Sequence, residues 1–185
     1  MILAFFLEEP SAREMLEGVL PRIINDDIHV KYIVFDGKHD LEKQIEKKLK
    51  NWQLPNTKFI IIRDKDSADC LLIKSNLRQK CLNAGRNDVL IRIACSELES
   101  WYLGDLQAVE SGLGIRGLSG MQNNSKYRSP DILGNAAQEL FSITKKKYQK
   151  IGGSREISPY LKLDQSNKSD SFNVFIDGIL DIISN

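Results

Sequence analysis

Four short apolar runs, separated by stretches with helical periodicity, constrain the fold of this chain more than any other feature. The predicted strands are Ile2–Leu7, His29–Phe35, Phe59–Ile62 and Val89–Cys95. Between the second and third runs, apolar residues recur on one stripe of a helix predicted over Asp40–Trp52. Strands that alternate with helices in this way indicate βαβ units and a parallel sheet. We therefore predict a doubly wound, Rossmann-like α/β fold with a four-stranded parallel sheet of order 2-1-3-4.

Capping patterns predict where several helices begin. Ser11 and Glu14 have the Ser-x-x-Glu spacing of a capping box, and Ser96 and Glu99 repeat it. The helix after the third strand is expected from about Ser67 to Asn83. The apolar residues expected on it are Leu71, Leu72, Leu77 and Cys81.

Beyond the fourth strand the pattern changes from alternating to helical. Residues Ser111–Ser129 are rich in Gly, Ser and Asn, which is typical of a long, mobile loop. Further helices are predicted over about Asp131–Tyr148, Arg155–Leu163 and Ser171–Ile183. The last third of the chain is therefore expected to form a helical cap on or beside the sheet.

Length and composition favour a single core. A chain of 185 residues with 42% hydrophobic content can bury one good core, and a second full domain would be hard to fit. We divide the chain into an α/β domain over 1–110, a flexible loop over 111–130 and a helical extension over 131–185 that packs on the same domain. The apolar run at the N-terminus is too short for a signal peptide or a membrane span, so we expect a cytoplasmic protein without a membrane partner.

Charge and residue counts limit the functional classes. The net charge of +1 gives no overall basic field. A local excess of lysine between Lys145 and Lys168 fits either a phosphate-facing patch or a solvated helix face. The three cysteines form no C-x-x-C pair, and neither His29 nor His39 has a recognisable nucleophile nearby. Zinc sites and Ser-His-Asp triads are therefore not indicated.

Pairs of acids follow three of the predicted strands. They are Glu8 and Glu9, Asp64 and Asp66, and Glu97 and Glu99. In a sheet of order 2-1-3-4, strands one and three are neighbours at the switch point, so Glu8 should face the Asp pair. Unpaired carboxylates that lie close together raise one another's pKa, and a bound cation is the usual remedy. Because carboxylate oxygens suit hard cations, the pattern predicts a site for Mg²⁺ or Mn²⁺.

Several of these residues also have a structural interpretation. Asp64 is suited to open a turn, and Asp66 or Ser67 to cap the next helix. Lys65 is suited to meet a phosphate or to reduce repulsion between the neighbouring carboxylates. Trp101 is expected in the core, although stacking on a base is an alternative.

Two segments carry a resemblance to a known family. LEEPSAREML resembles the Glu-Gly-Pro-Thr-Glu segment that opens Toprim domains, and IIIRDKDSADC resembles their Asp-x-Asp segment. Over its whole length the chain is similar to a Toprim-related family of unknown function. It also resembles the nuclease domains of overcoming-lysogenization-defect proteins and RloB-like proteins. The sequence departs from the pattern at Glu9, where Toprim has Gly, and at Ala12, where an acid is common.

The resemblance implies a function and a set of roles. Glu8 would be a metal ligand or general acid/base, Asp64 and Asp66 metal ligands, and Glu97 or Glu99 a further ligand. The activity implied is Mg²⁺-dependent or Mn²⁺-dependent hydrolysis of DNA or RNA. An ABC-type ATPase partner and a setting in phage defence are also implied.

Three hypotheses follow for the function. The first is a metal-dependent nuclease, in which nucleic-acid contacts come from Lys65, Lys145, Lys146, Lys147 and Lys150. The second is a catalytically degenerate binding or sensor subunit of an ATPase complex, which is compatible with the lack of a P-loop motif in the sequence. The third is a receiver-like phosphoacceptor, which is disfavoured because no fifth strand with a following Lys is predicted.

Overall fold

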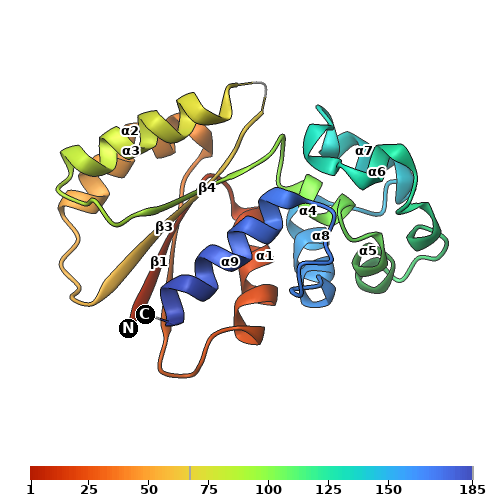
Figure 1. Cartoon of the computed structure of the whole chain (residues 1–185), viewed down its shortest axis with the longest axis horizontal. Helices are drawn as coiled ribbons and strands as arrows, with labels where there is room; N and C mark the ends of the chain where they lie inside the picture. Colours follow the sequence, from red (N-terminus) through yellow and green to blue (C-terminus); the bar gives the residue numbers. More distant parts are fainter. Residues whose placement is uncertain (67, 185) are drawn as a thin grey trace.

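The computed structural model describes residues 1–66 and 68–184 (Figure 1). Its strands are β1 (Ile2–Leu7), β2 (His29–Val34), β3 (Thr57–Asp64) and β4 (Leu90–Ala94). Its α-helices are α1 (Pro10–Val19), α2 (Gly37–Lys50), α3 (Cys70–Asn83), α4 (Glu99–Leu103), α5 (Leu106–Leu113), α6 (Ser125–Arg128), α7 (Ala136–Ile143), α8 (Lys150–Ile157) and α9 (Asp170–Ser184). Short 3-10 helices are η1 (Leu20–Arg22), η2 (Ser119–Met121), η3 (Pro130–Ile132) and η4 (Ser158–Tyr160).

The strands form one parallel sheet in the order β2-β1-β3-β4, which confirms the predicted α/β fold and strand order. In register, Leu7 of β1 lies beside Ile62 of β3, and Asp64 of β3 lies beside Ala94 of β4. All four strands therefore end at the same edge of the sheet. The acids that follow them in sequence are brought to that edge.

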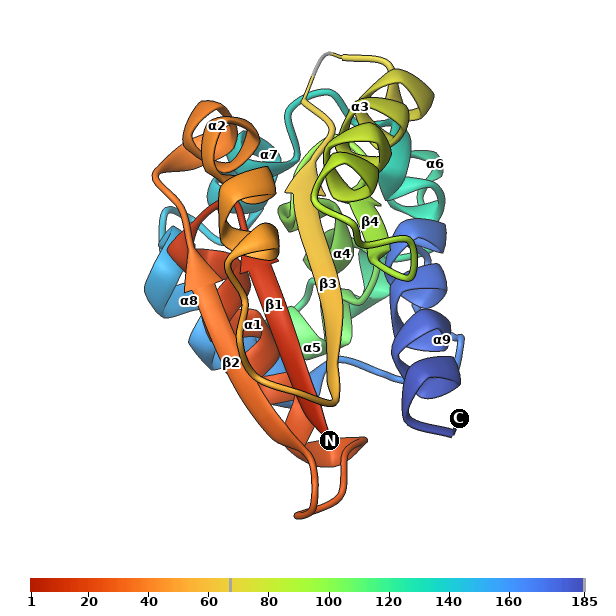
Figure 2. The same cartoon turned by 90° about the vertical axis from the view of Figure 1, so that its left-hand side faces the viewer.

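Helices cover both faces of the sheet (Figures 1 and 2). On one face, α2 and α3 pack over alternate residues of the strands, including Phe6 and Ile61. On the other, α1 and α9 pack over the remaining strand residues, such as Phe5 and Ile60, in a core that continues into α4, α5 and α8. Because β1 is buried on both faces, its unbroken apolar sequence follows directly from its central place.

The capping-box predictions are wrong. Helix α1 begins at Pro10, with Glu9 as its N-cap, and the Ser11 hydroxyl donates to a Glu9 carboxylate oxygen at 2.7 Å. A Pro at the first helical position needs no backbone partner, which explains why the helix begins there. Helix α4 begins at Glu99 after Leu98, with no capping side chain.

The start predicted for the third helix is also wrong. Helix α3 begins at Cys70, and its N-cap is Asp69, whose side chain accepts from the Leu72 amide at 2.8 Å. The alternative cap, Ser67, lies outside the described residues. Leu71 and Leu72 point to solvent, with 78% and 60% of their surface exposed.

The last predicted helix, Ser171–Ile183, is confirmed to within one residue at each end by α9, whereas the two before it differ from their predicted spans. The helix expected over Asp131–Tyr148 is split into η3 and α7, and the one expected over Arg155–Leu163 is replaced by α8 and η4. A turn at Lys145 and Lys146, both with positive φ, separates α7 from α8. The segment 111–130 contains η2 and α6, and it buries Leu118 and Tyr127.

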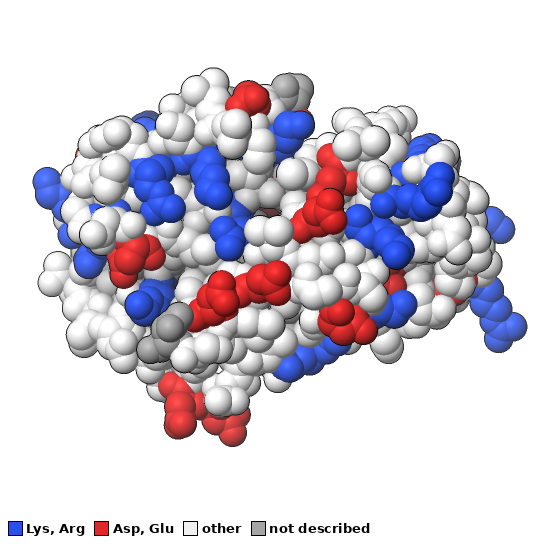
Figure 3. Space-filling model, in the orientation of Figure 1, with Lys and Arg blue, Asp and Glu red and all other residues white. Residues whose placement is uncertain are grey.

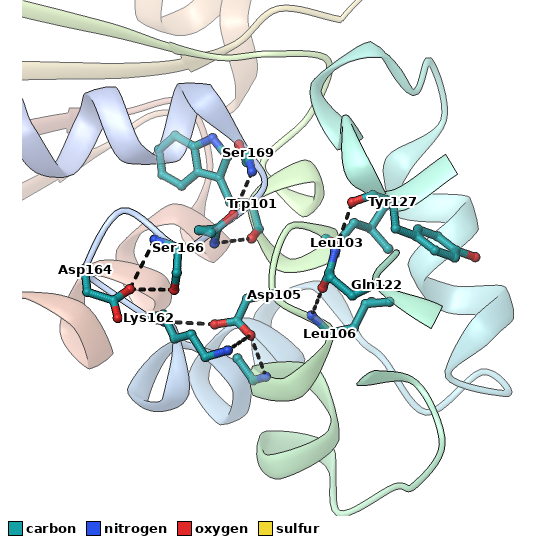
Figure 4. A network of polar contacts seen from close by, with 12 residues as sticks. Trp101, Leu103, Asp105, Leu106, Gln122, Tyr127, Lys162, Asp164, Ser166 and Ser169 are labelled. Carbon is teal, nitrogen blue, oxygen red and sulfur yellow. Dashed lines mark hydrogen bonds and ion pairs between the residues drawn. The ribbon is translucent and has the colours of Figure 1, made fainter. Parts of the chain in front are cut away.

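Polar side chains that are buried or half-buried join this region together. Asp105 caps α5 and also accepts from the Lys162 amide at 2.9 Å, which ties the segment before α9 to α5 (Figure 4). Gln122 bonds the amide of Leu106 and the carbonyl groups of Leu103 and Tyr127. The chain from α4 to α9 is therefore fixed by side-chain bonds to backbone as well as by apolar packing.

Charged side chains of both signs are spread over the face shown in Figure 3, in keeping with a net charge of +1. None of the helices within residues 1–66 and 68–184 is long and apolar enough to cross a membrane.

The contact between α5 and α8 can be tested with two glycines. A Cβ at Gly112 would lie 2.4 Å from the Glu156 carbonyl oxygen, whereas a Cβ at Gly152 would meet nothing within 4 Å. We expect Gly112→Ala to lower the free energy of unfolding by about 1–3 kcal/mol, because backbone would have to move. Gly152→Ala should be neutral or stabilising by up to about 1 kcal/mol. Urea denaturation measures both, and equal effects would contradict this packing.

Candidate functional site

The carboxyl edge of the sheet gathers acids from three strands, as the sequence predicts. Glu8 follows β1, and one of its carboxylate oxygens accepts a hydrogen bond from the Asp64 amide at 3.1 Å. This bond joins the ends of two neighbouring strands. It also fixes the Glu8 side chain over the last residue of β3.

Asp64 is the most buried of the acids predicted after β1 and β3. Only 8% of its surface is exposed, because it is the last residue of a central strand and not part of the loop after it. Burial raises its pKa well above the ordinary value, and repulsion from Glu9, Glu99 and Glu8 raises it further. These four carboxyl groups come from three parts of the chain: the residues after β1, the end of β3 and the start of α4.

Glu99 contributes a further acid to the site, from α4. It is fully buried in the first turn of α4, and one of its oxygens accepts from the Tyr148 hydroxyl at 2.9 Å. Its other oxygen, Oε2, has no hydrogen-bond partner among the described residues. Burial raises the pKa of Glu99. A buried carboxyl oxygen without a donor is costly, so a further interaction at this atom would stabilise the site.

Lys150 enters the acidic cluster from the C-terminal helices. Its ammonium group lies 3.0 Å and 3.1 Å from the two oxygens of Glu9. Burial lowers its pKa, but Glu99 and Glu9 outweigh this and hold the pKa above its ordinary value. Lysine is unfavourable at the first position of a helix, yet Lys150 begins α8. Attraction to the acids accounts for its place.

Asp66 lies on the outer side of the site. Its backbone is left-handed, with φ of 52°, and its amide donates to the Ser96 carbonyl at 2.8 Å. Its carboxylate forms an ion pair with Lys38 of α2 at 2.7 Å. Repulsion from Asp66 contributes to the raised pKa of Glu8, although burial is the larger cause. Asp66 is therefore near Glu8, but its charge is already paired with the ammonium group of Lys38.

The structure separates the two acids after β4. Glu99 points into the cluster, whereas Glu97 accepts a hydrogen bond from the Ala137 amide at 2.7 Å, in the first turn of α7. Trp101 is fully buried and stacks on Phe175 of α9, so the core interpretation of this residue is confirmed.

The lysines expected to bind nucleic acid differ in their exposure and their contacts. Lys145 and Lys146 are exposed in the turn before α8, and Lys147 donates to the carbonyl of Leu113. Lys150 lies among the acids, and Lys65 is partly exposed beside them.

The site holds a cluster of carboxyl groups with one inserted ammonium group. Within residues 1–66 and 68–184, no three or more His, Cys, Asp and Glu side chains are placed so that they could hold a metal ion. Binding an ion at Glu8, Asp64 and Glu99 would therefore need side chains to rearrange. The raised pKa of Asp64 and the unpartnered Oε2 of Glu99 both favour an added cation.

Sequence reasoning missed Lys38, Tyr148 and the ion pair of Lys150 with Glu9. The first two lie 28 and 49 residues from the acids they contact, and no local pattern links them. A weak signal existed for Lys150, because a lysine just before Ile151-Gly152-Gly153 breaks the usual preference at a helix start.

The raised pKa of Asp64 predicts how stability depends on pH. The folded protein holds this proton more tightly than the unfolded chain, so stability should fall as pH rises from the ordinary pKa through the raised one. With a metal chelator present, Asp64→Asn should be more stable than the unchanged protein at pH 7.5, with a smaller difference at pH 4.5.

The measurement is the urea midpoint at the two pH values, and Asp26→Asn in an exposed turn is the matched control. A pH-independent difference for Asp64→Asn would show that the carboxyl group is not destabilised by its surroundings.

Comparison with known proteins adds one finding. No curated protein and no solved structure matches the chain. The model of one family matches residues 7–180, which include the whole acidic cluster and the helices that enclose it. The chain therefore belongs to the family described as domain of unknown function DUF4276.

Proposed function

We propose that this protein is a Toprim-like, Mg²⁺-dependent phosphodiesterase that cleaves DNA or RNA. The observation that carries the proposal is the meeting of Glu8, Asp64 and Glu99 at the carboxyl edge of a parallel sheet. In open α/β sheets this edge is where ligands bind. Acids brought together there from separate strands destabilise one another unless they gain a cation, and hydrolysis of a phosphodiester uses one.

The acids of the cluster would have two roles, metal binding and proton transfer. Glu8, Asp64 and Glu99 would hold Mg²⁺ or Mn²⁺, with Asp66 joining them after it leaves Lys38. When bound, the metal would polarise the phosphate and lower the pKa of an attacking water. Glu8, oriented through one oxygen by the Asp64 amide, is placed to accept a proton with the other.

Lysines would supply the positive charge on the substrate side. Lys65 lies between the two aspartates in sequence, where a phosphate bound at the acids would come within reach of its side chain. Lys150 would neutralise Glu9, which stands where Toprim has glycine and would otherwise repel a phosphate. The exposed Lys145 and Lys146 would add contacts to the sugar-phosphate backbone.

The biological setting proposed is phage defence with an ABC-type ATPase partner. It rests on the resemblance of the LEEPSAREML and IIIRDKDSADC segments to Toprim nucleases of the overcoming-lysogenization-defect and RloB-like kinds.

A second function is favoured by the ion pairs in the site. Lys150 neutralises Glu9 and Lys38 neutralises Asp66, so part of the acidic charge is balanced by the chain itself. A protein that had lost catalysis but kept the fold would have this arrangement. In that case the chain would act as a binding or sensor subunit of an ATPase complex.

Metal binding is the first test of the nuclease proposal. Titration calorimetry should show that Mg²⁺ or Mn²⁺ binds the unchanged protein, and that Asp64→Ala/Asp66→Ala removes the binding because two carboxylates are lost. Asp26→Asn should bind like the unchanged protein. Binding that persists in the double variant would place the ion elsewhere.

Cleavage is the second test. With Mg²⁺ or Mn²⁺, the protein should cut at least one of plasmid DNA, single-stranded DNA and RNA. Asp64→Asn and Glu8→Gln should each lower the rate by about 100-fold or more, since each removes a charge from the reacting centre. The release of labelled fragments measures the rate. Metal binding without cleavage of any substrate, also in the presence of the partner ATPase, would favour the binding subunit.

A further inference from the structure

A cavity of about 520 Å³ opens beside the acidic site, between α3, the edge strand β4 and α9. Its wall includes Lys65, which adjoins Asp64 and Asp66 in sequence. The catalytic acids themselves do not line it. The cavity is within the size range of sites that hold a small ligand or part of a larger one.

Two cations face this cavity without partners. Among the described residues, the ammonium groups of Lys65 and Lys74 form no hydrogen bond or ion pair. Arg92 also lines the cavity, but it donates to the Val174 carbonyl at 3.1 Å and serves to hold α9 against β4. Figure 3 shows Lys and Arg side chains on one side of a hollow near the middle of this face, and acidic side chains on the other. The free cations fit an anionic group such as a phosphate.

Part of the cavity wall is apolar. Ile91 and Ile93 of β4 are buried at its base, whereas Ile132 and Val174 are 83% and 52% exposed. Large aliphatic side chains that are this exposed at the mouth of a cavity are suited to cover the flat face of a ring. A ligand with a planar ring and an adjoining anion would use both features.

The acidic side of the cavity offers hydrogen-bond acceptors. Asp131 is held by the Ser169 hydroxyl at 2.6 Å and the Ser171 amide at 2.8 Å, so its carboxylate is fixed in place. Asp170 lies beside it at the start of α9. Carboxylates opposite a cationic wall suit a ring that carries amino groups, as adenine, cytosine and guanine do.

We propose that this cavity is a subsite for one unstacked nucleotide of a single strand, next to the phosphate that is cleaved. Its phosphate would lie at Lys65 and Lys74, and its base between Ile132 and Val174. The inference rests on the proposed function and narrows it, because a base within a duplex stack has no access to the cavity. The substrate is therefore single-stranded DNA or RNA.

Binding without cleavage tests this subsite. In a chelating buffer, fluorescence anisotropy should show tighter binding of a labelled 12-nucleotide single strand than of the duplex of the same sequence. Lys74→Glu and Ile132→Asp alter exposed side chains, so both variants should fold. Each should weaken single-strand binding by about tenfold, because a contact to phosphate or base is lost. Lys31→Glu, exposed on the opposite edge strand β2, makes the same charge change and should have a smaller effect.

Thiol protection locates the bound strand. Cys70 and Cys95 line the cavity, whereas Cys81 is fully buried on the inner side of α3, so alkylation of the folded protein reports on the cavity. The single strand should slow alkylation of Cys70 and Cys95, and the duplex should not. Mass spectrometry of the digested protein measures each site separately.

The outcomes separate the subsite from the catalytic proposal. Selective binding of the single strand and protection of the two thiols, with no cleavage under any metal condition, would support the subsite and contradict the proposed hydrolysis. Cleavage with unchanged binding by Lys74→Glu and Ile132→Asp would overturn the subsite alone. Equal protection by the duplex, protection by a free mononucleotide but not by the strand, or no binding of any oligonucleotide would each overturn it too.

Discussion

Burial of carboxyl groups at one end of the sheet is the constraint on which the rest of the site depends. Asp64 ends a central strand and Glu99 starts a buried helix, so neither can turn its charge to solvent. Charge in such a place must be neutralised by protonation, by a partner or by a bound ion. The Tyr148 hydroxyl meets part of this need at Glu99, and attraction to Lys150 acts against the rise in pKa of both Glu99 and Asp64.

This need explains the position of α8. The helix packs on α1 and α5, and its first residue is the lysine that lies against Glu9. Glu9 in turn is the N-cap of α1, so one ion pair links the start of two helices that are far apart in the sequence. The position of α8 on α1 therefore also sets the position of the ammonium group beside the acidic edge.

The sheet could be predicted from the sequence because each strand is a continuous apolar run, and burial on both faces demands such a run. The helices after Glu99 could not be placed as well. Their boundaries depend on distant bonds such as Asp105 to Lys162 and Glu97 to Ala137. The Ser-x-x-Glu spacing at Ser11 and Ser96 predicted the wrong helix starts. Helix α1 begins one residue earlier, at Pro10, and Glu99 is buried in the site instead of capping α4. The acids themselves were predictable, but the lysines that neutralise them were not.

The boundary between the α/β domain and the helical extension marks a change in the sequence pattern, but the candidate site uses residues from both parts. Glu8, Asp64 and Glu99 come from the α/β part, yet Tyr148 and Lys150 are supplied from beyond it. The cavity beside the acids likewise needs α9, since Asp170, Ser171 and Val174 form one of its walls. A sheet with these acids but without the later helices would expose Trp101 and leave Glu99 without the Tyr148 hydroxyl. Whatever chemistry the acidic edge performs, the C-terminal third of the chain completes the site in which it happens.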